Sequence, residues 1–263
     1  MKDEELFSGR TYDDFLFRPQ KGTAASRSEV RLTTQGTRGI TLELPILPAN
    51  MDSVTESRMA RVLALEGGLG VIHRGMSKVG IGPGRGCRTR VETAAGVPQL
   101  QAVHEAWSAV GASIPIIADG GVHNDKDLFL ALICGASSVM LGSLLSGTDE
   151  APGTVIVDPA TGEKRKIYRG MTSPQAVFEA LYDDADPESM ELALETPAEG
   201  QEVQVPYHGS VRDVLQRMRG HLRSAVSYGG ESSLAVVRAK VLADPASFLI
   251  RLSAASRQES FER

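Results

Sequence analysis

A cysteine on a glycine-rich turn is the residue of this sequence best suited to chemistry. Cys87 ends the run Gly82-Pro83-Gly84-Arg85-Gly86-Cys87, which follows a short strand-like segment. Glycines allow backbone conformations and close approaches that side chains forbid. Arg85, Arg88 and Arg90 would surround the sulfur with positive charge, which favours the thiolate over the thiol. Because a thiolate attacks carbon, the pattern indicates a nucleophile; a turn cysteine without a chemical role is the open alternative.

Cys134 contrasts with Cys87, because it follows the apolar run Leu128-Phe129-Leu130-Ala131-Leu132-Ile133. That run predicts a buried helix, and we expect Cys134 to serve core packing. Two cysteines in such different surroundings do not suggest a disulfide. A reducing compartment, the cytoplasm or another inside the cell, is the better expectation.

Composition is that of a globular enzyme: 263 residues, 41% of them hydrophobic and 23% charged. One large α/β domain over residues 1–263 is favoured over two small ones. The formal net charge of −5 leaves no general basic surface for nucleic acid, so anion recognition must be local. The acidic start Met1-Lys2-Asp3-Glu4-Glu5 is unlike a signal peptide, and no apolar run approaches the roughly 20 residues of a membrane span.

Alternating strand and helix patterns predict a parallel sheet. Buried strands are expected at 45–51, 70–73, 78–82, 115–119 and 138–142, with helices at 55–65 and 100–110 and a third that Asn124 caps. In such sheets the chemistry gathers at the carboxyl ends of the strands. Asp119-Gly120-Gly121, Gly142-Ser143 and the Cys87 turn all follow strands in this way.

The pattern weakens later in the chain. Residues 158–162 suggest a hairpin-like turn, and residues 174–207 are polar and acidic, which predicts a mobile active-site flap. Order returns with an apolar helical stripe that is more plausibly core than a partner site, formed by Val211, Val214, Leu215, Met218 and Leu222.

Taken together, these segments resemble the IMP dehydrogenase and GMP reductase family over most of the chain. The resemblance is carried by Thr11 to Phe15, Ser26 to Val30, Ala49 to Glu56, Gly67 to Arg74, Lys78 to Cys87, Ala118 to Gly121, Met140 to Leu145 and Tyr168 to Met171. It implies a TIM-type (β/α)8 barrel, a single catalytic domain that binds a purine 5′-monophosphate. Cys87 would attack C2 of the base and form a thioimidate, and a nicotinamide cofactor would exchange hydride there.

The resemblance also implies roles for individual residues. Asp119 would bind the ribose hydroxyls, and backbone N–H groups at the two glycine turns would hold the phosphate. The implied nucleotide-binding residues are Ala49, Met51, Asp119, Gly120, Gly121, Gly142, Ser143, Tyr168, Gly170 and Met171. Thr172 and Ser173 would contact the cofactor. Backbone carbonyls of Gly82, Gly84 and Cys87 could hold a monovalent cation, K⁺ in the dehydrogenase branch. A homotetramer is the expected assembly.

The favoured branch is GMP reductase, which reduces GMP to IMP and ammonia with NADPH. No arginine occurs from Pro174 through Val211, whereas the dehydrogenase branch uses an arginine followed by a tyrosine in this flap. Thr89 and Glu199 would then form the catalytic pair that protonates departing ammonia. The alternatives are an IMP dehydrogenase, which oxidises IMP to XMP with NAD, and a purine-nucleotide-binding protein without activity. Residues Ser143 to Thr148 are closer to the dehydrogenase branch.

Two departures from the family pattern stand out. Arg85 and Arg88 occupy positions where the family has serine and threonine, and Arg85 could form a fork with the phosphate or point into solvent. The barrel also lacks several central βα units, because five candidate strands are found and eight are needed. We predict that Ser77 and Lys78 flank an excised or unlisted stretch, which would hold the remaining units and any paired regulatory CBS module.

Overall fold

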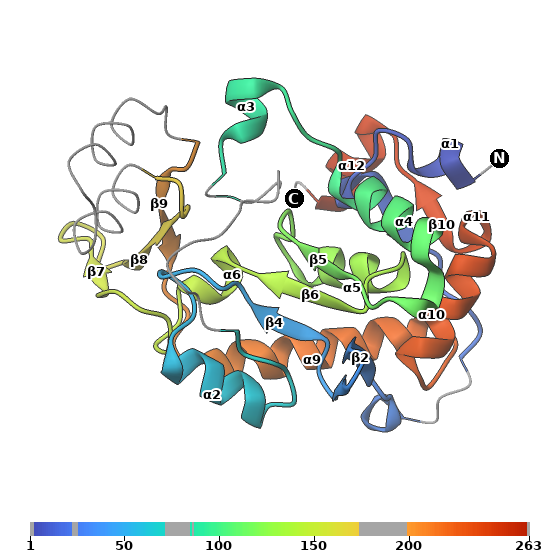
Figure 1. The fold of residues 1–263 in the computed structure, drawn as a ribbon, viewed down its shortest axis with the longest axis horizontal. Coiled ribbons are helices and arrows are strands. Elements are labelled where there is room, and N and C mark those ends of the chain that lie inside the picture. The colour runs from blue at the N-terminus through green and yellow to red at the C-terminus, as the bar shows by residue number, and fades with distance from the viewer. Residues whose placement is uncertain (1–2, 23–25, 72–84, 86, 174–198, 262–263) are drawn as a thin grey trace.

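The centre of the molecule is a three-stranded parallel sheet with the strand order β4-β6-β5 (Figure 1). A computed structural model describes residues 3–22, 26–71, 85, 87–173 and 199–261. Strands β4 (Ile46–Pro48), β5 (Ile117–Asp119) and β6 (Ser138–Leu141) come from three of the predicted strand segments. Their parallel pairing requires crossover connections, and helices supply these in the chain.

Helices pack around this sheet, and the apolar repeats of the sequence predict all but the last of them. They are α2 (Ser57–Leu65), α4 (Gln99–Val110), α5 (Asp125–Ile133), α9 (Val211–Tyr228) and α10 (Leu234–Ala243). The predicted stripe of α9 is confirmed as core, since all five of its members are buried. Helix α5 is buried from Asp127 to Ile133, and Cys134 directly after it is fully buried, as expected.

A second sheet, antiparallel and with the order β7-β8-β9, lies beside the first (Figure 1). Strands β7 (Ile156–Val157) and β8 (Lys164–Arg169) form the predicted hairpin around residues 158–162. Strand β9 (Glu202–Pro206) pairs with β8 over five residue pairs. The last part of the flap predicted over 174–207 is therefore a paired strand, and the mobility of that flap stays a prediction. Residues 174–198 lie outside the described part of the chain.

Two short sheets and several small helices complete the description. Antiparallel pairs are formed by β1 (Phe15–Phe17) with β10 (Leu249–Arg251) and by β2 (Thr34–Thr37) with β3 (Ile40–Leu42). The short helices are α1 (Asp3–Phe7), α3 (Thr89–Thr93), α6 (Ser143–Ser146), α11 (Pro245–Phe248) and α12 (Ala254–Phe261), with 3-10 turns at Tyr12–Asp14, Arg27–Glu29 and Gly111–Ser113. Within the described residues, none of the helices is long and apolar enough to cross a membrane.

The fold is mixed α/β, but the described strands form separate sheets and not a closed barrel. A closed eight-stranded barrel needs strands on both sides of every member. The expected strand at 78–82 and the Ser77–Lys78 junction lie outside the described residues, and Gly70 and Val71 are not in a strand. Ile117 of β5, an edge strand of this sheet, is 43% exposed, which is unusual for an apolar residue of a parallel sheet.

The side chain of Asn124 caps the N-terminus of α5, as predicted. Its Oδ1 accepts a hydrogen bond of 3.1 Å from the backbone N–H of Asp127. Replacing Asn124 with Ala should lower the free energy of unfolding by about 1 kcal/mol, measured by urea denaturation. Asn124→Ser, which keeps a capping oxygen, should retain most of the stability. Equal stability of the Ala variant and the parent would contradict the capping role.

Candidate functional site

Three predicted nucleotide-binding segments meet at the carboxyl edge of the parallel sheet. Strand β6 pairs Leu141 with Pro48 of β4 and Met140 with Asp119 of β5, so all three strands end at nearly the same level. The backbone N–H of Ala49 then donates to the carbonyl of Leu141 over 2.8 Å. The structure thus brings Ala49, Asp119 and Gly142 to one edge.

The turn after β5 depends on two glycines. Gly120 and Gly121 have φ angles of +87° and +73°, a region that side-chain-bearing residues rarely adopt. Asp119 just before them is solvent-exposed, but protein atoms crowd its carboxylate, and this desolvation raises its pKa. Gln99 fixes the turn by donating from Nε2 to the Asp119 carbonyl over 2.7 Å.

Tyr168 of β8 links the two larger sheets. Its side chain is buried, and its hydroxyl packs so close to Gly142 that a Cβ at that glycine would lie 2.7 Å from the hydroxyl oxygen. Burial first, and the nearby negative charges of Asp119 and Cys87 second, raise the pKa of Tyr168 to about 12. The phenol therefore keeps its proton at neutral pH and remains a hydrogen-bond donor beside the Gly142 turn.

The loop after β4 is tied to the end of β8. Arg169 donates from Nε to Asp52 Oδ2 over 2.9 Å, and Ser53 Oγ donates to the Arg169 carbonyl over 3.2 Å. Gly170 then donates its N–H to the carbonyl of Gln201 in the segment before β9. These contacts hold the predicted residues Met51, Gly170 and Met171 near the same edge. The sequence analysis missed Asp52 and Arg169, which are 117 residues apart and show no local pattern.

The three predicted catalytic residues are in direct contact. The Cys87 thiol donates to Thr89 Oγ1 over 3.4 Å, and Thr89 Oγ1 donates to Glu199 Oε2 over 2.5 Å. A β-bridge between Cys87 and Gly200 and a hydrogen bond of 2.6 Å from the Arg88 N–H to the Glu199 carbonyl hold the two segments together. Cys87, at the end of this chain of contacts, is half-buried.

Gly200 permits this close approach. A Cβ on Gly200 would lie 2.4 Å from the Ser173 backbone nitrogen and 2.6 Å from the Thr172 carbonyl carbon. Its N–H donates to the Thr172 carbonyl over 3.1 Å. Thr172 and Ser173, the two residues predicted to contact the cofactor, differ in exposure: Thr172 is half-buried, and Ser173 is fully buried. Direct contact of the Ser173 side chain with a cofactor is therefore not supported.

The expected ring of arginines around the sulfur is only partly present. Arg88 pairs with Glu92 one turn later in α3, with Nε 2.8 Å from Oε1, and Arg90 donates to the Val97 carbonyl. Glu92, four residues after Arg88, therefore binds the Arg88 guanidinium in place of a group beside the sulfur. Arg85 is the remaining candidate for a positive charge near the sulfur. Its charge opposes the rise in the pKa of Tyr168, and its backbone carbonyl accepts a hydrogen bond from Gln201 Nε2 over 3.0 Å. Gly82 and Gly84 of the expected cation site lie outside the described residues.

Comparison with known proteins identifies the family to which the chain is similar. A family model described as IMP dehydrogenase / GMP reductase domain matches residues 9–78 and 75–262. Proteins named inosine-5′-monophosphate dehydrogenase are similar: one from Aquifex aeolicus is 43% identical over 76% of this chain and 39% of its own length. Another from Nitrosopumilus maritimus is 46% identical over 60% of this chain and 33% of its own, and one from Rhizobium tropici is 42% identical over 70% and 35%. The chain spans about two-fifths or less of these relatives.

Native thiol reactivity should distinguish the two cysteines. Cys87 is half-buried at an open edge, whereas Cys134 is 0% exposed and burial raises the pKa of its thiol. A disulfide reagent should therefore label one thiol rapidly in the native protein and the second only in denaturant. Cys87→Ser should remove the rapid phase, and Cys134→Ser should leave it. The reverse assignment would show that the Cys87 sulfur is inaccessible.

Proposed function

The chain belongs to the IMP dehydrogenase / GMP reductase family, and we propose on that basis that it is an oxidoreductase acting on a purine 5′-monophosphate. Cys87 would bond transiently to C2 of the base. The observation that carries this proposal is the contact chain from Cys87 through Thr89 to Glu199 beside the carboxyl edge of the sheet. A nucleophile next to a hydroxyl and a carboxylate can both form the bond and manage protons.

The nucleotide would be anchored by the strand ends. Backbone N–H groups at Gly120-Gly121 and Gly142-Ser143 suit a phosphate, because glycine lets the main chain approach an anion closely. Asp119 would accept from the ribose hydroxyls, and the protonated phenol of Tyr168 would donate to the phosphate. Ala49, Met51, Gly170 and Met171 would line the same edge. Arg85 is a further candidate for the phosphate.

We propose oxidation of IMP to XMP as the reaction, the activity named for the similar proteins. To release XMP from the Cys87 adduct, a water would add to C2 and its proton would pass through Thr89 to Glu199. The C2–S bond would then break, with its electron pair returning to sulfur. The Thr89–Glu199 contact supports this role, since general base catalysis requires a group within hydrogen-bond reach.

A nicotinamide cofactor, NAD for this direction, would exchange hydride at C2 when bound. The chain offers Thr172 for it, a half-buried hydroxyl residue whose carbonyl is bonded to Gly200 beside Cys87. A neutral polar residue at this position fits an uncharged carboxamide. Ser173 fits less well because it is fully buried.

GMP reductase is the second candidate, and a specific observation favours it. Residues 174–211 contain no arginine, so the flap has no cation to activate a water. In this direction Thr89 and Glu199 would instead deliver a proton to the departing ammonia, with NADPH as reductant. The same contact geometry serves both directions, because a proton relay can be run either way.

Absorbance of the reduced nicotinamide decides between these candidates. With IMP and NAD, the proposed function predicts formation of NADH and XMP; consumption of NADPH with GMP would establish the reductase instead. Cys87→Ala should abolish turnover in either direction and leave nucleotide binding measurable, because phosphate and ribose contacts are separate from the sulfur. Turnover undiminished by this substitution would rule out the covalent step. Calorimetric binding of IMP without turnover in any condition would favour a binding protein.

The raised pKa of Asp119 gives a pH prediction. The ribose hydroxyls need an ionised acceptor, so affinity for IMP should be full above the Asp119 pKa and fall as the pH decreases through it. Because desolvation raises this pKa, the fall should begin above the pH of about 4 expected for an ordinary aspartate. Calorimetric dissociation constants of IMP measured against pH test this.

Asp119→Asn is the matched control, and it should bind IMP about tenfold or more weakly at neutral pH. The phosphate of the nucleotide titrates with both proteins, so the difference between their pH profiles isolates the carboxylate. Identical profiles would remove Asp119 from ribose recognition.

A further inference from the structure

A cavity of about 520 Å³ lies at the opposite end of the parallel sheet from the proposed nucleotide site. Pro115 and Ser137, which precede β5 and β6, form one wall, and α10 forms another. Asp119 and Gly142 lie at the carboxyl ends of the same strands. The cavity is therefore separate from the contacts around Cys87, and its volume is that of a small-molecule site.

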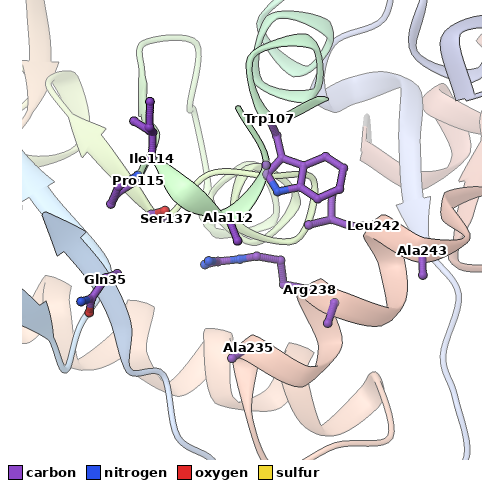
Figure 2. Close-up of a pocket in the computed structure, with 13 residues that line it drawn as sticks. Gln35, Trp107, Ala112, Ile114, Pro115, Ser137, Ala235, Arg238, Leu242 and Ala243 are labelled. Atoms are coloured by element: carbon purple, nitrogen blue, oxygen red, sulfur yellow. The ribbon is translucent and has the colours of Figure 1, made fainter. Parts of the chain in front are cut away.

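Arg238 of α10 is the single charged residue among those that line the cavity. Its Nε donates to the Leu132 carbonyl over 2.8 Å, and its Nη2 lies 3.4 Å from Thr34 Oγ1. Both partners are neutral, and no carboxylate of the described residues forms an ion pair with it. A guanidinium carries five N–H donors, so these two contacts leave donors for a ligand. Figure 2 shows the side chain reaching across the cavity toward Gln35.

Burial in the protein disfavours the charged form of Arg238. Burial lowers the pKa of Arg238 to about 10, so the group stays protonated at neutral pH but loses much of its hydration. A desolvated cation gains more from an anionic partner than an exposed one does, because water no longer screens the attraction.

The remaining walls are largely apolar. Trp107 and Leu242 face the cavity on one side, and Ile114 lies on the other (Figure 2). Trp107 presents a large aromatic surface on which a planar ring can stack. The polar groups are few, Gln35 and Ser137 besides Arg238. A single cation in an apolar chamber matches a ligand with one negative charge, since a second charge would remain uncompensated.

We propose that this cavity binds a small aromatic monoanion, whose acidic group pairs with Arg238 and whose ring packs against Trp107. The charge complementarity and the apolar walls together define the ligand class. This inference does not depend on the proposed oxidoreductase function, because no residue that lines the cavity belongs to the site around Cys87.

The test uses 8-anilino-1-naphthalenesulfonate, an aromatic monoanion, and N-phenyl-1-naphthylamine, which lacks the sulfonate. Trp107 is the only tryptophan of the chain, so energy transfer from tryptophan to the probe reports binding, and the variants of cavity residues locate it. We expect saturable binding at one site per chain. Arg238→Gln should lower the affinity for the sulfonate probe by about tenfold or more and leave the affinity for the uncharged probe nearly unchanged. Arg238→Lys, which keeps the charge, should retain most of the sulfonate affinity.

A second variant keeps the inference testable if Arg238→Gln does not fold. Ala239 lines the cavity from α10 and is exposed, so Ala239→Leu should fold while it fills part of the chamber. Ala239→Leu should lower the affinity for both probes, although Arg238 is intact. Thermal melts of each variant show whether its fold is retained. Equal sulfonate affinity in the parent, Arg238→Gln and Ala239→Leu would overturn the proposal, as would probe binding without energy transfer from Trp107.

Discussion

The double pairing of β6 is the constraint on which the rest of the structure depends. This strand hydrogen-bonds to β4 on one side and to β5 on the other, both in parallel, so the register of one strand fixes where the other two end. Asp119 and the Gly142 turn reach one edge only because both registers hold. The same pairing sets the opposite ends of the strands, and with them the wall of the Arg238 cavity. A shift of one residue would turn the side chains to the wrong face of the sheet.

The β8–β9 pair provides the second element of the site, because it carries distant segments to this edge. Tyr168 of β8 packs on the Gly142 turn, while the segment before β9 brings Glu199 and Gly200 against Cys87. The contacts of Cys87 and Thr89 with the segment before β9 join residues more than a hundred positions apart, such as Thr89 and Glu199. A proton relay between them needs both the pairing of the strands and the absence of a side chain at Gly200. The proposed chemistry would therefore depend on backbone packing as much as on the side chains of Cys87, Thr89 and Glu199.

Local patterns in the sequence predicted the local structure well. The apolar repeats of α4 and α9, the Asn124 cap and the strands before Asp119 and Gly142 follow from periodicity and turn chemistry, which act within a few residues. Contacts between distant segments have no such signal, and the nearness of Thr89 to Glu199 came only from family resemblance. Periodicity also failed for short elements. The five-residue helix α3 redirects Arg88 to Glu92, and β9, whose side chains alternate between polar and apolar, was assigned to a flap.

Within the described residues, the strand ends that carry the site belong to an open three-stranded sheet. Residues 117, 118 and 119 alternate between exposed, buried and exposed, so Ile117 and Asp119 point to the same side of β5. In a closed barrel that side would face a filled interior, where an apolar Ile117 would be covered. Here Ile117 is 43% exposed, and the carboxylate two residues later is open to solvent although protein crowds it. Two of the three strands of this sheet, β5 and β6, lead into the turns at Gly120 and Gly142, so the exposed face of β5 leaves the groups that would hold a nucleotide in place.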